Sequence, residues 1–342
     1  MSTPPDQALR ALPRVSVVVP THQRPELLRR CLRALLQQSI GPQAYEIVVV
    51  DDGRQDAVRA LVRALVHEQA QRPDAPALRY LRPHGHGPAS ARNVGWRAAR
   101  APLIAFTDDD TIAHPDWLAQ GEAALRARPD WPALGGRVLV PLEGGPSRAP
   151  SDHERMTQGL QQAEFVTANA FVRRAELARL GGFDERFRRA WREDSDLQFR
   201  LLQQAGPVGR CDAARVLHPV RPERWGVCLR QQRNAFFDAL LYKKHPRLYR
   251  ERIRRTPPWN YYAIVALGVA TLVLLVLGEM PMAVVAALLA LSLVLQLAGK
   301  RLRHTSHQVD HVLEMLATSA LIPFLSVYWR LRGALHFKVF FL

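Results

Sequence analysis

Two long uncharged runs near the end of the chain most constrain what this sequence can fold into. They cover residues 259–278 and 280–299, separated by the single charge of Glu279. Each run reaches the ~20 apolar residues that an α-helix needs to cross a bilayer. The alternative is a pair of buried helices in a soluble domain, for which both runs are unusually long. The sequence therefore predicts a transmembrane hairpin over residues 259–299.

Cations flank this hairpin on both sides. Residues 215–255 contain twelve Lys or Arg against three acids, and the hairpin is followed by Lys300, Arg301 and Arg303. Because positive charge is retained on the cytoplasmic side of membranes, we expect a multi-pass protein of the inner or plasma membrane with its preceding domain in the cytoplasm. The net charge of +16 could also attract nucleic acid. The usual RNA-binding signatures are absent, so no nucleic-acid partner is expected.

Before the basic segment, apolar strands alternate with amphipathic helices. Early strands are predicted at residues 15–19, 47–50, 78–81 and 103–106. Helical periodicity separates them, and the short connections predict an α/β domain with a mostly parallel sheet and helices on both faces. Later strands are predicted at residues 133–140 and 165–172, followed by a helix for which Asp194 is a candidate N-cap and Gly206 a stop.

The chain therefore divides into five consecutive parts. They are a leader (1–13), the α/β domain (14–220), a basic membrane-proximal segment (221–258), the transmembrane hairpin (259–299) and a third apolar or amphipathic helix region (300–342). In the last part, residues 315–329 form an uncharged run that contains Pro323. A full crossing there would place the cations that follow on the outer side of the membrane. We therefore expect a re-entrant or surface-lying helix.

Carboxylates follow two of the predicted strands. Asp51 and Asp52 come after residues 47–50, and Asp108, Asp109 and Asp110 come after residues 103–106. The carboxyl ends of parallel strands form the edge of a sheet where ligands bind. Three adjacent aspartates repel one another unless a cation or water screens them, and a divalent ion with oxygen ligands would turn that repulsion into a site. A solvated acidic turn is the alternative, but the preceding strand favours a metal site.

Seven motifs occur in order along the first 220 residues. They are VSVVVPTHQRPELLRRCLRALLQQ, EIVVVDDG, ARNVGWRAA, LIAFTDDDTIAHPDWL, TANAFVRRAEL, GGFDERF and REDSDLQFR. Together they resemble the family 2 glycosyltransferases of the GT-A-type, Rossmann-like fold. The resemblance implies an inverting enzyme that moves a sugar from a nucleotide-diphosphate donor (a UDP-, GDP- or dTDP-sugar) to an acceptor. It also implies Mg²⁺ or Mn²⁺ as a cofactor.

The resemblance assigns the acids after the fourth strand to the metal and the diphosphate. Asp108 and Asp110 resemble the family's metal-binding DxD carboxylates, and Asp109 lies between them. Asp108 and Asp109 are expected beside the donor, although the sequence does not rank the three acids. Arg92 and Asn93 resemble the segment near the diphosphate. For Arg92, a surface cation on a helix is an open alternative.

In this resemblance, residues at the ends of the first two strands are expected to bind the base and the ribose of the donor. Asp52 resembles the acid that accepts a hydrogen bond from a uracil-type base. Asp51 is its alternative, or an acid that shapes the turn. Pro20 and Thr21 are expected to line the base and the ribose.

Transfer with inversion needs a base beside the acceptor, because sugar hydroxyls are very weak acids. Asp194 matches the family's catalytic base, and an N-cap is the structural alternative. Asp196 and Arg200, spaced i, i+4, are expected to form a helix salt bridge.

The acceptor is less well defined by the sequence. The segment RPERW, which includes Trp225, only partly matches the QxxRW motif of processive members, so processive synthesis is not expected. The membrane hairpin favours a lipid-linked or glycan acceptor. A metal-dependent nucleotidyltransferase and a non-catalytic membrane scaffold with the same fold are the alternative functions.

Overall fold

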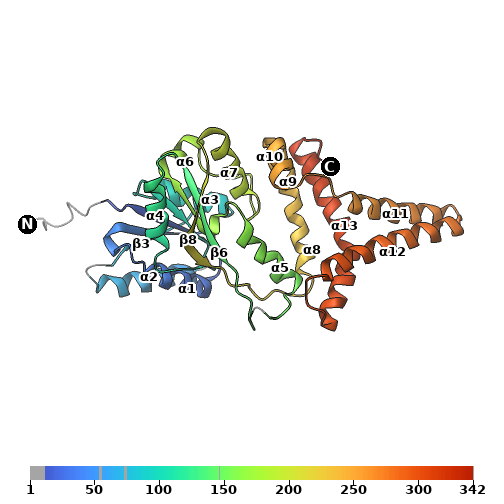
Figure 1. The fold of residues 1–342 in the computed structure, drawn as a ribbon, viewed down its shortest axis with the longest axis horizontal. Helices are drawn as coiled ribbons and strands as arrows, with labels where there is room; N and C mark the ends of the chain where they lie inside the picture. The colour runs from blue at the N-terminus through green and yellow to red at the C-terminus, as the bar shows by residue number, and fades with distance from the viewer. Residues whose placement is uncertain (1–11, 54–55, 73–74, 146, 342) are drawn as a thin grey trace, which may run out of the picture. The chain divides into compact units, whose positions relative to one another are not determined.

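The structure is a computed structural model that describes residues 12–341 except 54–55, 73–74 and 146. The predicted leader therefore lies almost wholly outside the described residues. The chain forms two compact units (Figure 1). Of the described residues, the first unit contains those up to Pro141 together with Leu160–Pro219, and the second contains those of Leu142–Gly159 and those after Pro219.

The first unit is built on an eight-stranded sheet with the order β3-β2-β1-β4-β7-β6-β8-β5. The strands are β1 (Val15–Thr21), β2 (Tyr45–Asp51), β3 (Ala77–Leu81), β4 (Leu103–Phe106), β5 (Ile112–Ala113), β6 (Ala133–Leu139), β7 (Ala170–Arg173) and β8 (Gly209–Leu217). The four strands β3, β2, β1 and β4 are all parallel. Strand β7 runs antiparallel to β4 and β6, and β8 is parallel to β6. The predicted α/β sheet is confirmed.

Strand β1 is central because it pairs with β2 on one edge and β4 on the other, and all seven of its residues are buried. Its carboxyl end, like those of β2 and β4, points to the same edge of the sheet. The helices of this unit are α1 (Pro25–Leu35), α2 (Asp56–Ala70), α3 (Pro88–Ala98), α4 (Trp117–Ala127), α6 (Arg174–Leu180) and α7 (Glu193–Gln204). One buried cluster joins Trp96 of α3, Leu177 of α6 and Leu197 of α7 to Ile104 and Phe106 of β4.

Two local predictions differ from the structure. The strand expected at residues 165–172 is shorter, because the 3₁₀ turn Thr167–Asn169 precedes β7. In this turn, the Asn169 side chain donates to the carbonyl oxygens of Arg137 and Ala214, which requires it to point inward rather than follow a strand pleat. The N-cap prediction for Asp194 is wrong: α7 begins at Glu193 after a left-handed Arg192 (φ 74°), so Asp194 is the second helical residue.

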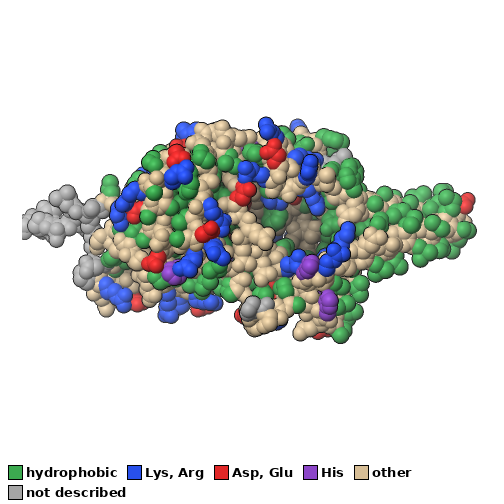
Figure 2. Space-filling view, viewed as in Figure 1, with side chains coloured by type: hydrophobic (Ala, Val, Ile, Leu, Met, Phe, Trp, Pro, Cys, Tyr) green, Lys and Arg blue, Asp and Glu red, His purple; other side chains and the backbone are tan. Residues whose placement is uncertain are grey.

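The second unit is helical. Its helices are α5 (Asp152–Gln158), α8 (Val227–Gln231), α9 (Ala235–Lys244), α10 (Pro246–Arg252), α11 (Trp259–Val276), α12 (Met280–Leu302) and α13 (Val309–Phe337). The predicted hairpin is formed by α11 and α12, with Gly278 at φ 80° in the turn between them. Only 6% of the most apolar window of α11 is buried, and Figure 2 shows hydrophobic side chains covering the hairpin. Such an apolar surface needs a non-aqueous neighbour.

Helix α13 is the third helix that is long and apolar enough to cross a membrane, with Pro323 inside it and 39% of its most apolar window buried. Whether it crosses or lies at the surface stays a prediction.

Helix α5 belongs to the helical unit although its sequence lies between β6 and β7. Arg301 of α12 donates to Asp152 (Nη2–Oδ2, 2.8 Å), and the Ser306 backbone N–H donates to the Pro150 carbonyl oxygen at 2.8 Å. Nothing in the sequence pattern indicated that this insertion would pack on the C-terminal helices.

Candidate active site

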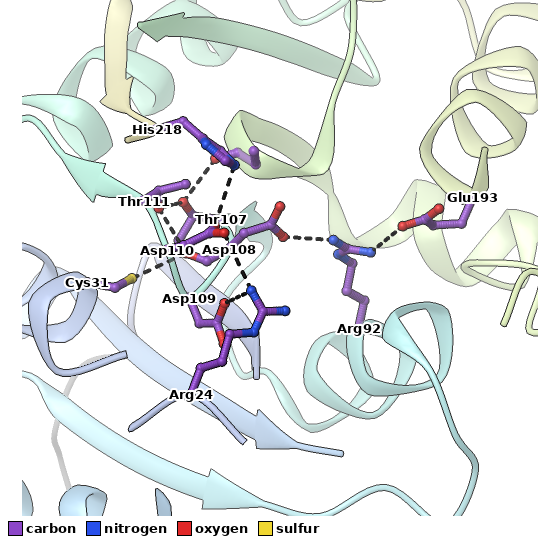
Figure 3. Close-up of polar contacts among 11 residues, drawn as sticks. Arg24, Cys31, Arg92, Thr107, Asp108, Asp109, Asp110, Thr111, Glu193 and His218 are labelled. Atoms are coloured by element: carbon purple, nitrogen blue, oxygen red, sulfur yellow. Dashed lines mark hydrogen bonds and ion pairs between the residues drawn. The ribbon is translucent and has the colours of Figure 1, made fainter. Parts of the chain in front are cut away.

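Hydrogen bonds of two threonines, Thr107 and Thr111, hold the acidic turn after β4 in place (Figure 3). The hydroxyls of Thr107 and Thr111 lie 2.6 Å apart, and each also contacts a backbone carbonyl oxygen, that of Ala168 for Thr107 and that of Asp108 for Thr111. The Cys31 thiol also donates to the Asp108 carbonyl oxygen at 3.4 Å. These contacts fix the backbone of the turn, so the three carboxylates project in defined directions.

Asp109 is the most enclosed of the three acids and points back towards β1. Its Oδ2 accepts a hydrogen bond from the Thr21 hydroxyl at 2.7 Å, and its Oδ1 lies 3.2 Å from Arg24 Nη1. Burial raises the pKa of Asp109 to about 6, although Arg24 and the Thr21 hydroxyl both act to lower it. Asp109 therefore takes part in a network with the first strand.

Asp108 and Asp110 meet a histidine at the end of β8. One ligand atom each from Asp108, Asp110 and His218 lies within 4.8 Å of the others, and His218 Nε2 is 3.5 Å from Asp110 Oδ1. His218 Nδ1 is buried and has no hydrogen-bond partner among the described residues. Two carboxylates and an imidazole converging in this way form a site suited to a divalent cation. His218 was not among the residues predicted from the sequence, where its signal was its position directly after a strand.

Arg92 connects this turn to the start of α7. Its Nη2 donates to Asp108 Oδ1 at 2.8 Å, and its Nη1 donates to Glu193 Oε1 at 2.9 Å. Its side chain is 3% exposed, so the alternative of a surface cation is wrong. Burial alone would lower the pKa of Arg92, but the charges of Asp108 and Glu193 raise it. The guanidinium therefore stays charged between two acids from different elements.

The two acids that begin α7 differ in their surroundings. Glu193 is buried against Arg92, and burial raises its pKa to about 7. Asp194 is only partly buried, and its Oδ1 accepts a hydrogen bond from the Ser195 N–H at 2.7 Å. Burial also raises the pKa of Asp194. The positive charge of Arg92 lowers this pKa, and the negative charge of Asp108 raises it. Asp194 therefore lies within electrostatic range of the acidic turn.

Asp196, one turn further along α7, pairs with Arg200 at 2.8 Å, which confirms the predicted helix salt bridge.

The turn after β2 separates the roles of its two acids. Both oxygens of Asp51 are occupied, Oδ1 by the Gly53 N–H and Oδ2 by the Tyr80 hydroxyl, each at 2.8 Å. Asp51 therefore shapes the turn. Asp52 is more open: its Oδ2 accepts from the Gly87 N–H at 2.7 Å, and its Oδ1 lies 3.5 Å from Nδ1 of an exposed histidine, His86.

Thr21 joins the two acidic turns. Its carbonyl oxygen accepts a hydrogen bond from the Asp52 N–H at 2.9 Å, while its hydroxyl donates to Asp109. Pro20 precedes it in β1 and pairs in register with Val50. The predicted residues at the ends of β1, β2 and β4 are therefore neighbours.

Asn93 stands apart from this group. Its Nδ2 donates to the Phe183 carbonyl oxygen at 2.9 Å and to Glu185, and its Oδ1 accepts from the Phe183 N–H and from Trp96 Nε1. Gly182 precedes Phe183 at φ 74°. The buried amide thus holds this turn in place, and a contact with the diphosphate stays a prediction.

Known proteins resemble this chain in sequence and fold. Residues 16–181 match the model of glycosyl transferase family 2, and residues 103–299 match that of glycosyl transferase family group 2. A validoxylamine A glucosyltransferase of Streptomyces hygroscopicus subsp. limoneus is 29% identical over 286 residues, which cover 70% of this chain and 58% of the relative. A pre-mycofactocin glycosyltransferase of Mycobacterium tuberculosis is 29% identical over 245 residues, covering 68% of this chain and 48% of the relative. The chain thus spans about half to three fifths of these relatives' length.

A solved structure has the same fold. It is a mannosyltransferase from Pyrobaculum calidifontis in complex with GDP-Man and Mn²⁺, with a TM-score of 0.58, 20% identity, and coverage of 94% of this chain and 88% of that one. This likeness confirms the expected GT-A-type architecture. The model of glycosyl transferase family group 2 alone matches more than half of the 342 residues, and the model of family 2 matches the preceding strands as well. This chain therefore belongs to the family 2 glycosyltransferases.

Proposed function

We propose that this protein is an inverting glycosyltransferase that moves a sugar from a nucleotide-diphosphate donor to an acceptor hydroxyl. The observation that carries the proposal is the bridge from Asp108 through Arg92 to Glu193. Through it, the carboxylates suited to a cation lie beside the helix that presents Asp194. Cation-binding and proton-accepting groups are thus available at one edge of the sheet.

Asp108, Asp110 and His218 would hold the divalent ion. Two carboxylates suit Mg²⁺ or Mn²⁺, and the imidazole shifts the preference towards Mn²⁺. A bound ion of this kind acts as a Lewis acid that neutralises charge on the leaving diphosphate. Asp109 is not in this group; its contacts to Thr21 and Arg24 suit a role in shaping the donor site. The structural neighbour forms a complex with Mn²⁺, which supports the same expectation.

Asp194 is the residue best suited to accept the acceptor proton. As the acceptor oxygen bonds to the anomeric carbon, its O–H proton passes to the Asp194 carboxylate and the bond from the anomeric carbon to the diphosphate breaks. The nucleoside diphosphate leaves with the bonding electrons. Glu193 is less suited because it is buried and already bound to Arg92. Arg92 holds Asp108 and Glu193 in place during this step.

The nucleoside end of the donor is assigned to Asp52, Pro20 and Thr21. Oδ1 of Asp52 has a long contact of 3.5 Å to the exposed His86, which can give way to an N–H donor of a base such as uracil or guanine. Asp51 has both oxygens engaged, so its part is to shape the turn. The structural neighbour binds GDP-Man. UDP-, GDP- and dTDP-sugars all stay possible donors for this chain.

The acceptor is proposed to be a lipid-linked or glycan hydroxyl at the cytoplasmic face of the inner or plasma membrane. Support comes from the exposed apolar hairpin α11–α12 and from the cations that flank it. Trp225 is 58% exposed in the second unit and is available to stack on a sugar ring.

The test begins with a thermal-shift screen of UDP-, GDP- and dTDP-sugars in the presence of Mn²⁺, because a ligand of the native state raises the melting temperature. The donor that shifts it is then incubated with membrane lipids or oligosaccharides, and the released nucleotide is identified by chromatography. Release of a nucleoside diphosphate with sugar transfer is expected. Release of pyrophosphate would identify a nucleotidyltransferase instead, and binding or turnover of no donor would point to a scaffold.

Asp194→Asn tests the proposed base. Turnover should fall about 10²–10⁴-fold, since a neutral amide does not accept the proton. Affinities for Mn²⁺ and for the donor should change much less than turnover, because the charge of Asp194 acts on Asp108 from a distance while its hydrogen bond is to the Ser195 N–H. Near-normal turnover by the folded variant would reject this role.

A further inference from the structure

We propose that Arg24 is a displaceable counter-ion of the acidic turn. Without a bound ion it neutralises Asp109 and Asp110, and when a divalent ion takes over the charge of Asp110 it turns to the diphosphate of the donor. This inference rests on the proposed function, because it needs an ion and a diphosphate at the same place.

Arg24 lies between the end of β1 and the start of α1. It is the N-cap residue of α1, and Gln23 before it has a left-handed backbone with φ 55°. In the described structure, no side chain caps the N-terminus of α1, where Pro25 begins the helix. The positive end of the helix dipole therefore adds to the charge of Arg24 beside the acids.

The contacts of Arg24 are longer and more open than those of the other arginine at the site. Its Nη1 lies 3.2 Å from Asp109 Oδ1 and 3.5 Å from Asp110 Oδ2, and its side chain is 37% exposed. Arg92 uses two separate nitrogens at 2.8 and 2.9 Å and is buried. Short buried charge-assisted bonds hold a side chain in one place, whereas partly exposed pairs are weak. Arg92 is therefore fixed, and Arg24 is free to exchange its partner.

A divalent ion would compete directly with Arg24 for Asp110. One oxygen of Asp110 faces His218 and the other faces Arg24, each at 3.5 Å. An ion held by Asp110 draws on the charge that now attracts the guanidinium, and its own positive charge repels the guanidinium at short range. The new anion brought to this place is the donor's diphosphate, for which a guanidinium has matching geometry.

The experiment compares Arg24→Gln with Arg29→Gln. Arg29 lies on the helix that Arg24 precedes, is 43% exposed and pairs with Glu26 rather than with an acid of the turn after β4, so it is a matched control. Mn²⁺ binding is measured without nucleotide by electron paramagnetic resonance. Arg24→Gln should bind Mn²⁺ roughly threefold more tightly, since a competing ion pair has been removed. Arg29→Gln should bind it as the unaltered protein does.

Nucleotide binding is then measured at saturating Mn²⁺ with UDP and GDP, and with UMP and GMP for comparison. Arg24→Gln should bind the preferred diphosphate about tenfold more weakly, the value expected for one lost hydrogen bond to a charged group. The monophosphate should be affected less. Arg24→Lys, which keeps the charge without the planar fork, should retain normal Mn²⁺ affinity and lose part of the diphosphate affinity.

The proposal predicts shifts of opposite sign in the two measurements. Weaker or unchanged Mn²⁺ binding by Arg24→Gln would overturn it, as would unchanged diphosphate binding, provided that circular dichroism shows the variant folded. Both measurements are made without turnover. Opposite shifts without sugar transfer would therefore count against the proposed function alone, and transfer with unchanged shifts would count against Arg24 alone.

Discussion

Two acidic turns lie at the same edge of the sheet, one after β2 and one after β4. The carboxylates of the two turns have different partners. After β2, Asp51 is fully used by the Gly53 N–H and the Tyr80 hydroxyl, which leaves Asp52 as the open carboxylate. After β4, three carboxylates stay crowded together, and two arginines and a histidine face them. The first arrangement suits one hydrogen bond to an uncharged group, and the second needs a cation.

The largest effect that would sharpen this contrast is expected from Asp110→Ala. This change removes a proposed metal ligand, so we expect transfer to fall about 10²–10³-fold or more, as for loss of a group that stabilises developing charge. Mn²⁺ affinity should fall in parallel when measured by electron paramagnetic resonance. Normal Mn²⁺ affinity in this variant would show that the turn after β4 does not bind the ion through Asp110.

A smaller effect of a different kind is expected from Asp52→Ala. Removing a charged acceptor for a base N–H should weaken donor binding about 10- to 100-fold. Mn²⁺ affinity without nucleotide should stay unchanged, because Asp52 is not among the proposed ligands. Calorimetric titration with the donor and with Mn²⁺ alone checks both statements.

Tyr80→Phe is the matched control for Asp52→Ala, because it takes a hydrogen bond from the neighbouring Asp51 and otherwise removes the acceptor of an exposed side chain, Arg82. It leaves the buried Asp51 Oδ2 without the hydroxyl donor, which should lower the free energy of unfolding by about 2 kcal/mol. Donor affinity should persist. If Tyr80→Phe weakened donor binding as much as Asp52→Ala, the division of roles between the two acids would be wrong.

The smallest effect concerns the pH dependence of stability in the absence of metal. Burial raises the pKa of Asp109 from 3.8 to about 6, so the folded protein holds this proton more tightly than the unfolded chain. The stabilisation is present below pH 4 and is lost as the pH rises through about 6, with a size on the order of 3 kcal/mol. Urea unfolding in EDTA between pH 4 and 7 should show this decline.

Asp109→Asn serves as the comparison for that measurement, since an amide does not titrate. Its stability should vary less between pH 4 and 6 than that of the unaltered protein. An equal slope in both proteins would mean that Asp109 keeps an ordinary pKa in the folded state.

The parts of the fold that were predictable are those whose signal is local. The apolar runs that became β2 and β4 are buried along their whole length, and the acids of residues 51–52 and 108–110 stand at the ends of these two strands as expected. The hairpin was predictable for the same reason, because length and lack of charge are sufficient for a helix of that kind.

The parts that were missed depend on contacts between distant segments. His218 meets Asp110 across 108 positions of sequence because β8 joins the sheet beside β6 and β5, an order that no local pattern encodes. For Arg92, predicted near the diphosphate, a surface cation stayed an open alternative because a charged residue on a helix is usually solvated. Its burial follows from the placement of Glu193 against α3.

The insertion that carries α5 has a practical consequence for preparing the catalytic part alone. A fragment that stops near residue 220 would keep the acceptors Asp152 and Pro150 but would lose Arg301 and Ser306, which donate hydrogen bonds to them. The freed segment would expose a carboxylate and a carbonyl oxygen that are satisfied in the whole chain. To prepare this fragment without detergent, residues 142–159 would therefore have to be replaced by a short polar linker.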